Sequence, residues 1–176
     1  MATGVKASPQ LKSDYPRLAN YYLKYFGDVS ATELNNLKKW DLLILPNDYQ
    51  WIFPEFFNEY KKAKPDGLIL AYTYPAMVMS SNVNSLFRTV EAENLWLRDG
   101  DGAKIEMWPG LYAVSINNPK WQSANNQFLS QELDWHKWDG LMFDTVENSL
   151  ARFSQNGLDI NNDGRADSLA SADKLW

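Results

Sequence analysis

The sequence predicts an α/β fold: a partial (β/α)8 TIM barrel with about its first four strands and a hairpin-containing insertion after the third. Two observations predict it. Short apolar runs alternate with amphipathic segments over residues 17–74, which is typical of βαβ units and a parallel sheet. A further buried run, residues 138–144, ends on the carboxylate of Asp144. In barrels of parallel strands, chemical groups lie where the strands end, so we expect a functional site there.

Composition limits the possible partners. The 176 residues suit a single domain, and the net charge of −5 leaves no basic surplus for binding nucleic acid. No apolar run approaches the ~20 residues that cross a membrane, so we expect no membrane partner. The chain has no cysteine and one histidine, His136, which excludes thiolate chemistry and metal sites built from several histidines. An aromatic content of 14% is compatible with a carbohydrate partner, because aromatic faces stack on sugar rings.

The first elements follow in order from the N-terminus. Residues 1–15 are polar and are expected to form a flexible segment, whereas residues 16–176 form the domain. The aromatic and apolar residues 17–23 predict the first strand. Ser30 and Glu33 match a capping box, in which each side chain binds a free N–H group at the start of a helix. They predict a helix over about residues 31–39.

Two further strands and a second helix follow. The apolar run 41–46 is typical of a strand buried on both faces. Aromatic residues then recur at helical spacing from near Pro54, a residue that suits a first helical turn, to about residue 64. The run 68–74 predicts the third strand.

The next stretch interrupts the alternation and is predicted to be an insertion over residues 76–120. Residues 82–94 have helical spacing, and residues 95–98 and 103–108 predict a β-hairpin around a glycine-rich turn. The chain then returns to the βα pattern, with a helix over residues 122–133 and the fourth strand over residues 138–144. Long loops at this end of a barrel commonly carry function.

Five motifs in this order resemble a known family: RLANYYL (17–23), DLLILP (41–46), WLRDGDG (96–102), WDGLMFD (138–144) and DINNDGRAD (159–167). They are similar to the hypothetical glycosyl hydrolases of the TIM-barrel type, group fifteen of those families, which are related in style to polygalactosaminidase-like barrels. The resemblance spans residues 16–176. It implies an Asp at the end of strand four and action on a glycosidic bond.

The resemblance also implies that the chain corresponds to the N-terminal portion of such a barrel. A full barrel has eight βα units and typically about 250 residues, and only four strands are predicted here. We therefore expect activity only where the remaining strands are supplied in cis or in trans. The expected partners are carbohydrate and either the missing half barrel or a second copy of this chain.

Glycoside hydrolysis usually requires two carboxylates, and three candidates follow predicted strands. Asp144 is the first, as general acid, general base or nucleophile. Glu147 is a nearby alternative, and Asp48 after the second strand can also face the site. The partner carboxylate can equally lie in the missing half. The alternative for Asp144 is a turn-capping role through backbone N–H groups, and Asp139, before the strand, is interpreted as a turn residue.

Substrate-binding candidates are the polar and aromatic side chains near strand ends or in the insertion. Strand alternation decides which of them face the site, and the register does not follow from sequence. The candidates are Asn20, Tyr22, Asp48, Tyr72, Tyr74, Trp108 and Asn117.

A calcium-loop pattern covers residues 159–167. Oxygen-bearing residues occupy positions 1, 3, 5, 7 and 9 of the calcium-loop template: Asp159, Asn161, Asp163, Arg165 through its carbonyl, and Asp167. Gly164 permits the sharp turn, but position 12 holds Ala170 instead of Glu. The pattern predicts structural calcium; the alternative is a solvated turn rich in Asp and Asn. Calcium use and the substrate class predict an extracellular or cell-surface location.

Two functional hypotheses remain. The first is a glycoside hydrolase, as a fragment or truncated form, that acts on a polysaccharide or glycan through Asp144. The second is a non-catalytic carbohydrate-binding or interaction protein with a calcium-stabilised fold. Substitution of Asp144 by Asn abolishes hydrolysis under the first hypothesis and leaves glycan binding unchanged under the second.

Overall fold

The computed structural model describes residues 17–24, 29–80, 85–146 and 157–168. The predicted flexible segment 1–15 and the candidate Glu147 lie outside the described residues. The chain forms two compact units. The first unit comprises Met1–Tyr72 and Trp135–Met142, and the second comprises Thr73–Asp134 and Phe143–Trp176. No helix among the described residues is both long and apolar enough to cross a membrane.

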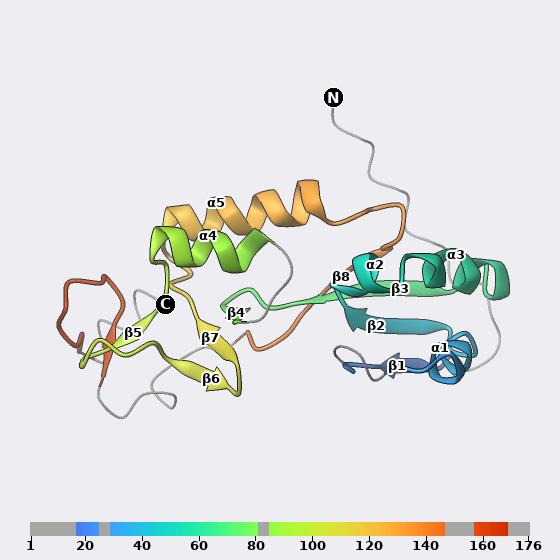
Figure 1. Cartoon of the computed structure of the whole chain (residues 1–176), viewed down its shortest axis with the longest axis horizontal. Coiled ribbons are helices and arrows are strands. Elements are labelled where there is room, and N and C mark those ends of the chain that lie inside the picture. Colours follow the sequence, from blue (N-terminus) through green and yellow to red (C-terminus); the bar gives the residue numbers. More distant parts are fainter. Residues whose placement is uncertain (1–16, 25–28, 81–84, 147–156, 169–176) are drawn as a thin grey trace. The chain divides into compact units, whose positions relative to one another are not determined.

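A four-stranded sheet contains all four strands that the sequence predicts (Figure 1). Its order is β1 (Ala19–Tyr21), β2 (Leu42–Pro46), β3 (Leu68–Thr73) and β8 (Gly140–Phe143). The β1–β2 and β2–β3 pairs are parallel, and Leu43 lies opposite Ile69. The fold is therefore a mixed α/β fold whose parallel sheet is compatible with part of a barrel. The first strand is shorter than the predicted 17–23.

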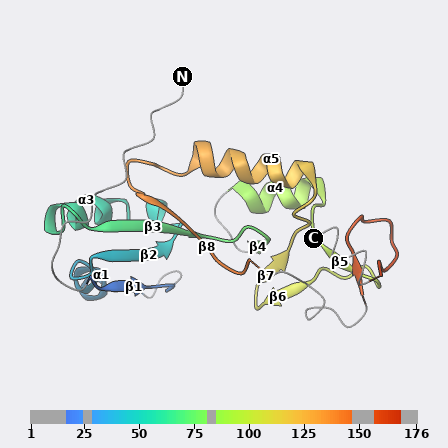
Figure 2. The ribbon, with the colours of Figure 1, turned by 180° about the vertical axis from the view of Figure 1, so that it is seen from behind.

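In the first unit, one helix follows β1 and two helices follow β2 before the chain enters β3 (Figure 2). Helix α1 (Ala31–Leu37) begins with the predicted capping box, because the Glu33 N–H donates to Ser30 Oγ and the Ser30 N–H donates to Glu33 Oε2. Helix α3 (Pro54–Ala63) buries the predicted aromatic face. A short helix, α2 (Tyr49–Ile52), precedes it and was not predicted, because four residues are too few to show a helical period.

Asp139 fixes the start of β8 against β3. Its Oδ2 accepts hydrogen bonds from the Ile69 N–H at 2.8 Å and from Lys61 Nζ at 2.7 Å. Its own N–H donates to the Ile69 carbonyl at 2.9 Å. These contacts hold the start of β8 against β3, a pairing role that the interpretation of Asp139 as a turn residue did not include.

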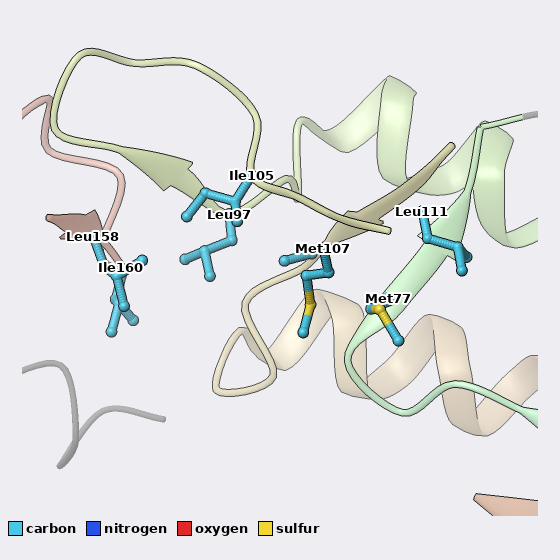
Figure 3. Close-up of a cluster of buried hydrophobic side chains, with 8 residues drawn as sticks. Met77, Leu97, Ile105, Met107, Leu111, Leu158 and Ile160 are labelled. Atoms are coloured by element: carbon cyan, nitrogen blue, oxygen red, sulfur yellow. The ribbon is translucent and has the colours of Figure 1, made fainter. Parts of the chain in front are cut away.

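The second unit contains two small antiparallel sheets and two neighbouring helices. One sheet has the order β4 (Met77–Met79), β7 (Leu111–Ala113) and β6 (Glu106–Trp108), and the other pairs β5 (Arg98–Asp99) with β9 (Leu158–Asp159). Helices α4 (Ser85–Glu93) and α5 (Pro119–Gln127) lie side by side (Figures 1 and 2), and a π-helical turn, η1 (Phe128–Glu132), continues α5. Buried side chains from the strands and from residues directly beside them form the cluster in Figure 3: Met77, Leu97, Ile105, Met107, Leu111, Ala113, Leu158 and Ile160.

Two boundaries in this unit differ from the predicted ones. The predicted hairpin is present as an Arg98–Lys104 bridge, but residues 106–108 form their ladder with β7 around Gly110, whose φ is +77°. The helix predicted over residues 122–133 begins earlier, at Pro119, because Asn118 accepts the Lys120 N–H and caps it. The Asn118-Pro119 pair, which the prediction did not use, is a sequence signal for this start, since proline suits the first helical position.

Candidate functional site

Asp144 directly follows β8 at the C-terminal end of the strand, as predicted. Its N–H donates to the Thr73 carbonyl at 3.1 Å, which ties it to the last residue of the neighbouring strand β3. Its Oδ1 accepts the Thr145 N–H at 2.7 Å. The bond from the Thr145 N–H is a turn-capping contact, so Asp144 has the capping role that the sequence analysis gave as the alternative to catalysis. A half-buried carboxylate held at a strand end is also the arrangement that acid–base chemistry uses.

Thr145, the next residue, has a strained backbone. Its φ is +53°, in the left-handed region that β-branched residues rarely adopt. This conformation costs roughly 1–2 kcal/mol relative to the right-handed one. Strain of this kind clusters at active sites and ligand-binding sites, where the surrounding structure maintains it. The strain therefore marks the turn after Asp144 as a functional candidate.

Replacement of Thr145 by Gly is expected to raise the free energy of unfolding by about 1 kcal/mol, because glycine adopts positive φ without steric cost. Urea unfolding measures the change. The matched control is Thr145→Ala, which also loses the hydroxyl and methyl groups but keeps a Cβ at positive φ. A Gly variant no more stable than the Ala variant would show that the turn is not strained.

Thr73 is a residue that the sequence analysis missed. Its side chain is buried, and its Oγ1 has no hydrogen-bond partner within the described parts of the chain. Buried hydroxyl groups normally have a partner, so an unpaired one requires an explanation. Thr73 ends β3 and its carbonyl accepts the Asp144 N–H. No sequence signal identifies it, because Thr is common in strands.

Within the first unit, Asp48 lies two residues after β2, at the C-terminal edge of the sheet. It is 4% exposed, and its Oδ1 has no hydrogen-bond partner among the residues that the structure describes. Burial raises the pKa of Asp48 from 3.8 to about 6. It directly precedes α2 but its side chain does not cap that helix. Such a carboxyl group can hold or release a proton near neutral pH.

Three other candidates from the first unit lie near the same edge. Asn20 is half-buried within β1. The Tyr22 hydroxyl donates to Glu33 Oε1 at 3.2 Å, and burial raises its pKa. Tyr72 is 3% exposed and packs edge-to-face against Tyr21, with ring centroids 5.4 Å apart. Tyr22, Asp48 and Tyr72 thus all lie at or just beyond the C-terminal ends of the parallel strands, and their contact with a substrate stays a prediction.

The remaining substrate-binding candidates belong to the second unit. Tyr74 packs against the hydrophobic cluster of Figure 3. Trp108 is 51% exposed on β6, and Asn117 is exposed in the turn before α5. Contact with sugar stays a prediction for all three.

The loop predicted to bind calcium folds on itself. Asp159, which is 2% exposed, accepts the N–H groups of Asp163 and Gly164, and Asp167 Oδ2 accepts the Ile160 N–H. Within the described ranges, no three or more acidic or histidine side chains are arranged to hold a metal ion. The acidic side chains therefore give the calcium prediction no support, and it stays a prediction.

Comparisons by sequence give no match, either to models of known protein families or to curated proteins. Solved structures do match. The glycoside hydrolase domain of PelA from Pseudomonas aeruginosa has a TM-score of 0.50 and 14% identity, over 74% of this chain and 45% of that one. A variant of the same domain has a TM-score of 0.49, with the same identity and coverage.

Ega3 from Aspergillus fumigatus, in complex with galactosamine, has a TM-score of 0.47 and 12% identity, over 87% of this chain and 52% of that one. The chain thus spans about half the length of the solved chains that it matches. The match to the PelA domain shows that the fold is glycoside-hydrolase-like. This agrees with the resemblance noted from the sequence at the level of fold, while the numbered family is not established.

Proposed function

We propose that the chain is part of a glycoside hydrolase that acts on a polysaccharide or glycan, with Asp144 as a catalytic carboxylate. One observation carries the proposal. Asp144 lies at the C-terminal end of β8, in a parallel sheet of a glycoside-hydrolase-like fold, next to the strained Thr145. The C-terminal ends of parallel strands are where such folds place their chemistry.

The proposed reaction breaks the bond between the anomeric carbon and the leaving-group oxygen. Water supplies a hydroxyl group to the anomeric carbon and a proton to the leaving group. Asp144 either donates the proton, activates the water or attacks the carbon, according to its distance from a second carboxylate. The bond from the Asp144 N–H to the Thr73 carbonyl and the bond from the Thr145 N–H to Asp144 Oδ1 support the proposal, because they hold Asp144 at the end of β8.

The test is the release of new reducing ends from a panel of soluble polysaccharides by the complete gene product that contains these residues. The proposal expects release by the wild type and none above background by Asp144→Asn. Equal release by both proteins, or no release from any polysaccharide, would contradict it. Glycan binding that persists without any release would instead favour the non-catalytic carbohydrate-binding protein.

We also propose that the loop from Asp159 to Asp167 binds calcium in a structural role. The motif supports it through oxygen donors at alternate positions and a glycine at the sharp turn. Gly164 has a φ of +83°, which suits that turn. The proposed extracellular or cell-surface location rests on calcium use and on the substrate class. The proposed completion of the barrel by further strands rests on the same resemblance as the activity.

Calcium is expected to raise the melting temperature of the protein, because an ion that binds only the folded state stabilises it. Thermal unfolding in a chelator and in millimolar calcium measures the shift. The control variant Asp163→Asn removes one carboxylate and is expected to reduce the shift. Identical melting temperatures in chelator and in calcium would contradict the calcium proposal.

A further inference from the structure

Asp144 and Tyr74 lie opposite each other at the ends of the neighbouring strands β8 and β3. The Asp144 N–H donates to the Thr73 carbonyl at 3.1 Å. In a parallel ladder, the residue that donates to one carbonyl lies opposite the residue that follows this carbonyl. The same sheet shows the rule, because the Tyr22 N–H donates to the Ile44 carbonyl while the register pairs Ile44 with the residue before Tyr22. Asp144 is therefore opposite Tyr74, and both belong to the second unit.

A second contact gives the same face of the sheet. A Cβ placed on Gly140 would lie 3.0 Å from Leu70 Cδ2, so Gly140 faces Leu70. Side chains alternate along a strand, so residues four positions apart point to the same face. Asp144 therefore shares the face of Gly140, and Tyr74 shares the face of Leu70. Because neighbouring strands lie about 5 Å apart, the side chains of Tyr74 and Asp144 leave the sheet next to each other.

The backbone at Tyr74 continues the extended conformation of β3. The next residue is Pro75, and a residue before proline is restricted to extended conformations. The carbonyls on both sides of Tyr74 are bonded, since that of Thr73 accepts the Asp144 N–H and that of Pro75 accepts Trp121 Nε1 at 3.0 Å. The Tyr74 ring packs against the buried cluster of Figure 3. A side chain held in this way loses little conformational entropy when a ligand binds.

The same alternation turns the Thr73 side chain to the opposite face of the sheet. Its buried hydroxyl group is therefore not the neighbour of the Asp144 carboxylate, although the two residues share a backbone bond. Thr73 is 4% exposed, whereas Tyr74 and Asp144 are both half-buried. Of these two residues at the end of β3, Tyr74 is the one that can meet a ligand together with Asp144.

We propose that the Tyr74 hydroxyl group binds the sugar ring whose glycosidic bond Asp144 acts on. A tyrosine suits a sugar because it combines an apolar ring with a hydroxyl group that forms hydrogen bonds. The proposal rests on the proposed function for the identity of the reacting residue. It adds the side chain that holds the sugar there, and the strand register, which does not follow from the sequence, is what identifies that side chain.

The test is kinetic and uses the complete gene product that contains these residues. The substrates are hydroxyethyl cellulose, xylan, mannan and chitosan, and reducing-end release gives kcat/KM for each one that is cleaved. Tyr74→Phe removes only the hydroxyl group and is expected to lower kcat/KM about tenfold, through the loss of one hydrogen bond to the substrate. The matched control is Tyr112→Phe, a half-buried tyrosine of the second unit that packs on Trp96, and it is expected to keep the wild-type value.

Binding is measured separately from cleavage, by isothermal titration of the Asp144→Asn protein. The probes are cellohexaose, xylohexaose, mannohexaose and chitosan hexamer. Tyr74→Phe in this background is expected to weaken the binding of the hexamer that matches the cleaved polysaccharide. The pH–rate profile is a further readout, because loss of a sugar contact lowers the rate at every pH, whereas an effect through Asp144 shifts the acidic limb. Circular dichroism and urea unfolding check that each variant is folded.

A folded Tyr74→Phe protein with wild-type kcat/KM and affinity would overturn the contact and leave the proposed function intact. A shifted pH profile with unchanged binding would also overturn it, because Tyr74 would then act through Asp144. Weaker binding by Tyr74→Phe, in a protein that cleaves none of the polysaccharides, would contradict the proposed function and support the contact. Absence of both cleavage and binding would overturn both proposals.

Discussion

Replacement of Asp144 by Asn is expected to lower the rate of glycan hydrolysis about 1,000-fold or more while the fold is retained. A positioned acid, base or nucleophile contributes roughly two to four orders of magnitude, and the amide of Asn can neither transfer the proton nor attack the anomeric carbon. The backbone bond from the Asp144 N–H to the Thr73 carbonyl does not depend on the side chain. The Asn side-chain oxygen can still accept the Thr145 N–H. Reducing-end release over time, with urea unfolding in parallel, measures both properties.

The matched control is Asp66→Asn, an exposed carboxylate in the turn before β3, at the opposite end of that strand. It is expected to hydrolyse glycans at the wild-type rate. An Asp144→Asn protein with the wild-type rate would reduce Asp144 to the turn-capping role that its Oδ1 contact already shows. The catalytic carboxylate would then have to be sought elsewhere.

The second large effect concerns Asp48 and the pH dependence of stability. Burial raises its folded-state pKa from 3.8 to about 6. The folded protein therefore binds this proton more tightly than the unfolded chain, and the resulting stability is present below about pH 4 and lost as pH rises through about 6. The difference corresponds to about 3 kcal/mol at neutral pH. Asp48→Asn is neutral at every pH, so its stability is expected to lack this decrease.

Urea unfolding at several pH values between 5 and 8 measures the upper part of this decrease, which begins near the unfolded pKa of 3.8. This window avoids the carboxylates of Glu33, Asp41 and Glu59, whose pKa values are lowered by hydrogen bonds to lysine and whose stabilisation is lost only at more acidic pH. Asp66→Asn again serves as the control and is expected to follow the wild-type profile. Parallel pH profiles for wild type and Asp48→Asn would show that Asp48 is not buried as a protonated acid.

The parallel sheet was predictable because its strands correspond to continuous apolar runs in the sequence. The runs at residues 41–46 and 68–74 are long enough to identify a strand buried on both faces, and β2 and β3 follow them closely. The capping box at Ser30 was predictable for a similar reason, since its two backbone contacts join residues only three positions apart. These elements depend on local sequence.

The second unit was less predictable because its strands have two or three residues and depend on distant partners. The pairing of β5 with β9 joins Arg98 to Asp159, and no local pattern indicates it. The same limit applies to the candidate site. The position of Asp144 follows from a strand end, whereas the unpaired Thr73 hydroxyl and the strained Thr145 result from the tertiary structure.

The most direct test of the proposed activity is digestion of the active polysaccharide in water enriched in oxygen-18, followed by mass spectrometry of the products. Hydrolysis of a glycosidic bond adds one oxygen from water. The proposal therefore predicts saccharides that gain one heavy oxygen when the protein cleaves them, and none with Asp144→Asn. Unlabelled, unsaturated products would indicate elimination instead of hydrolysis, and the absence of products would contradict a glycoside hydrolase altogether.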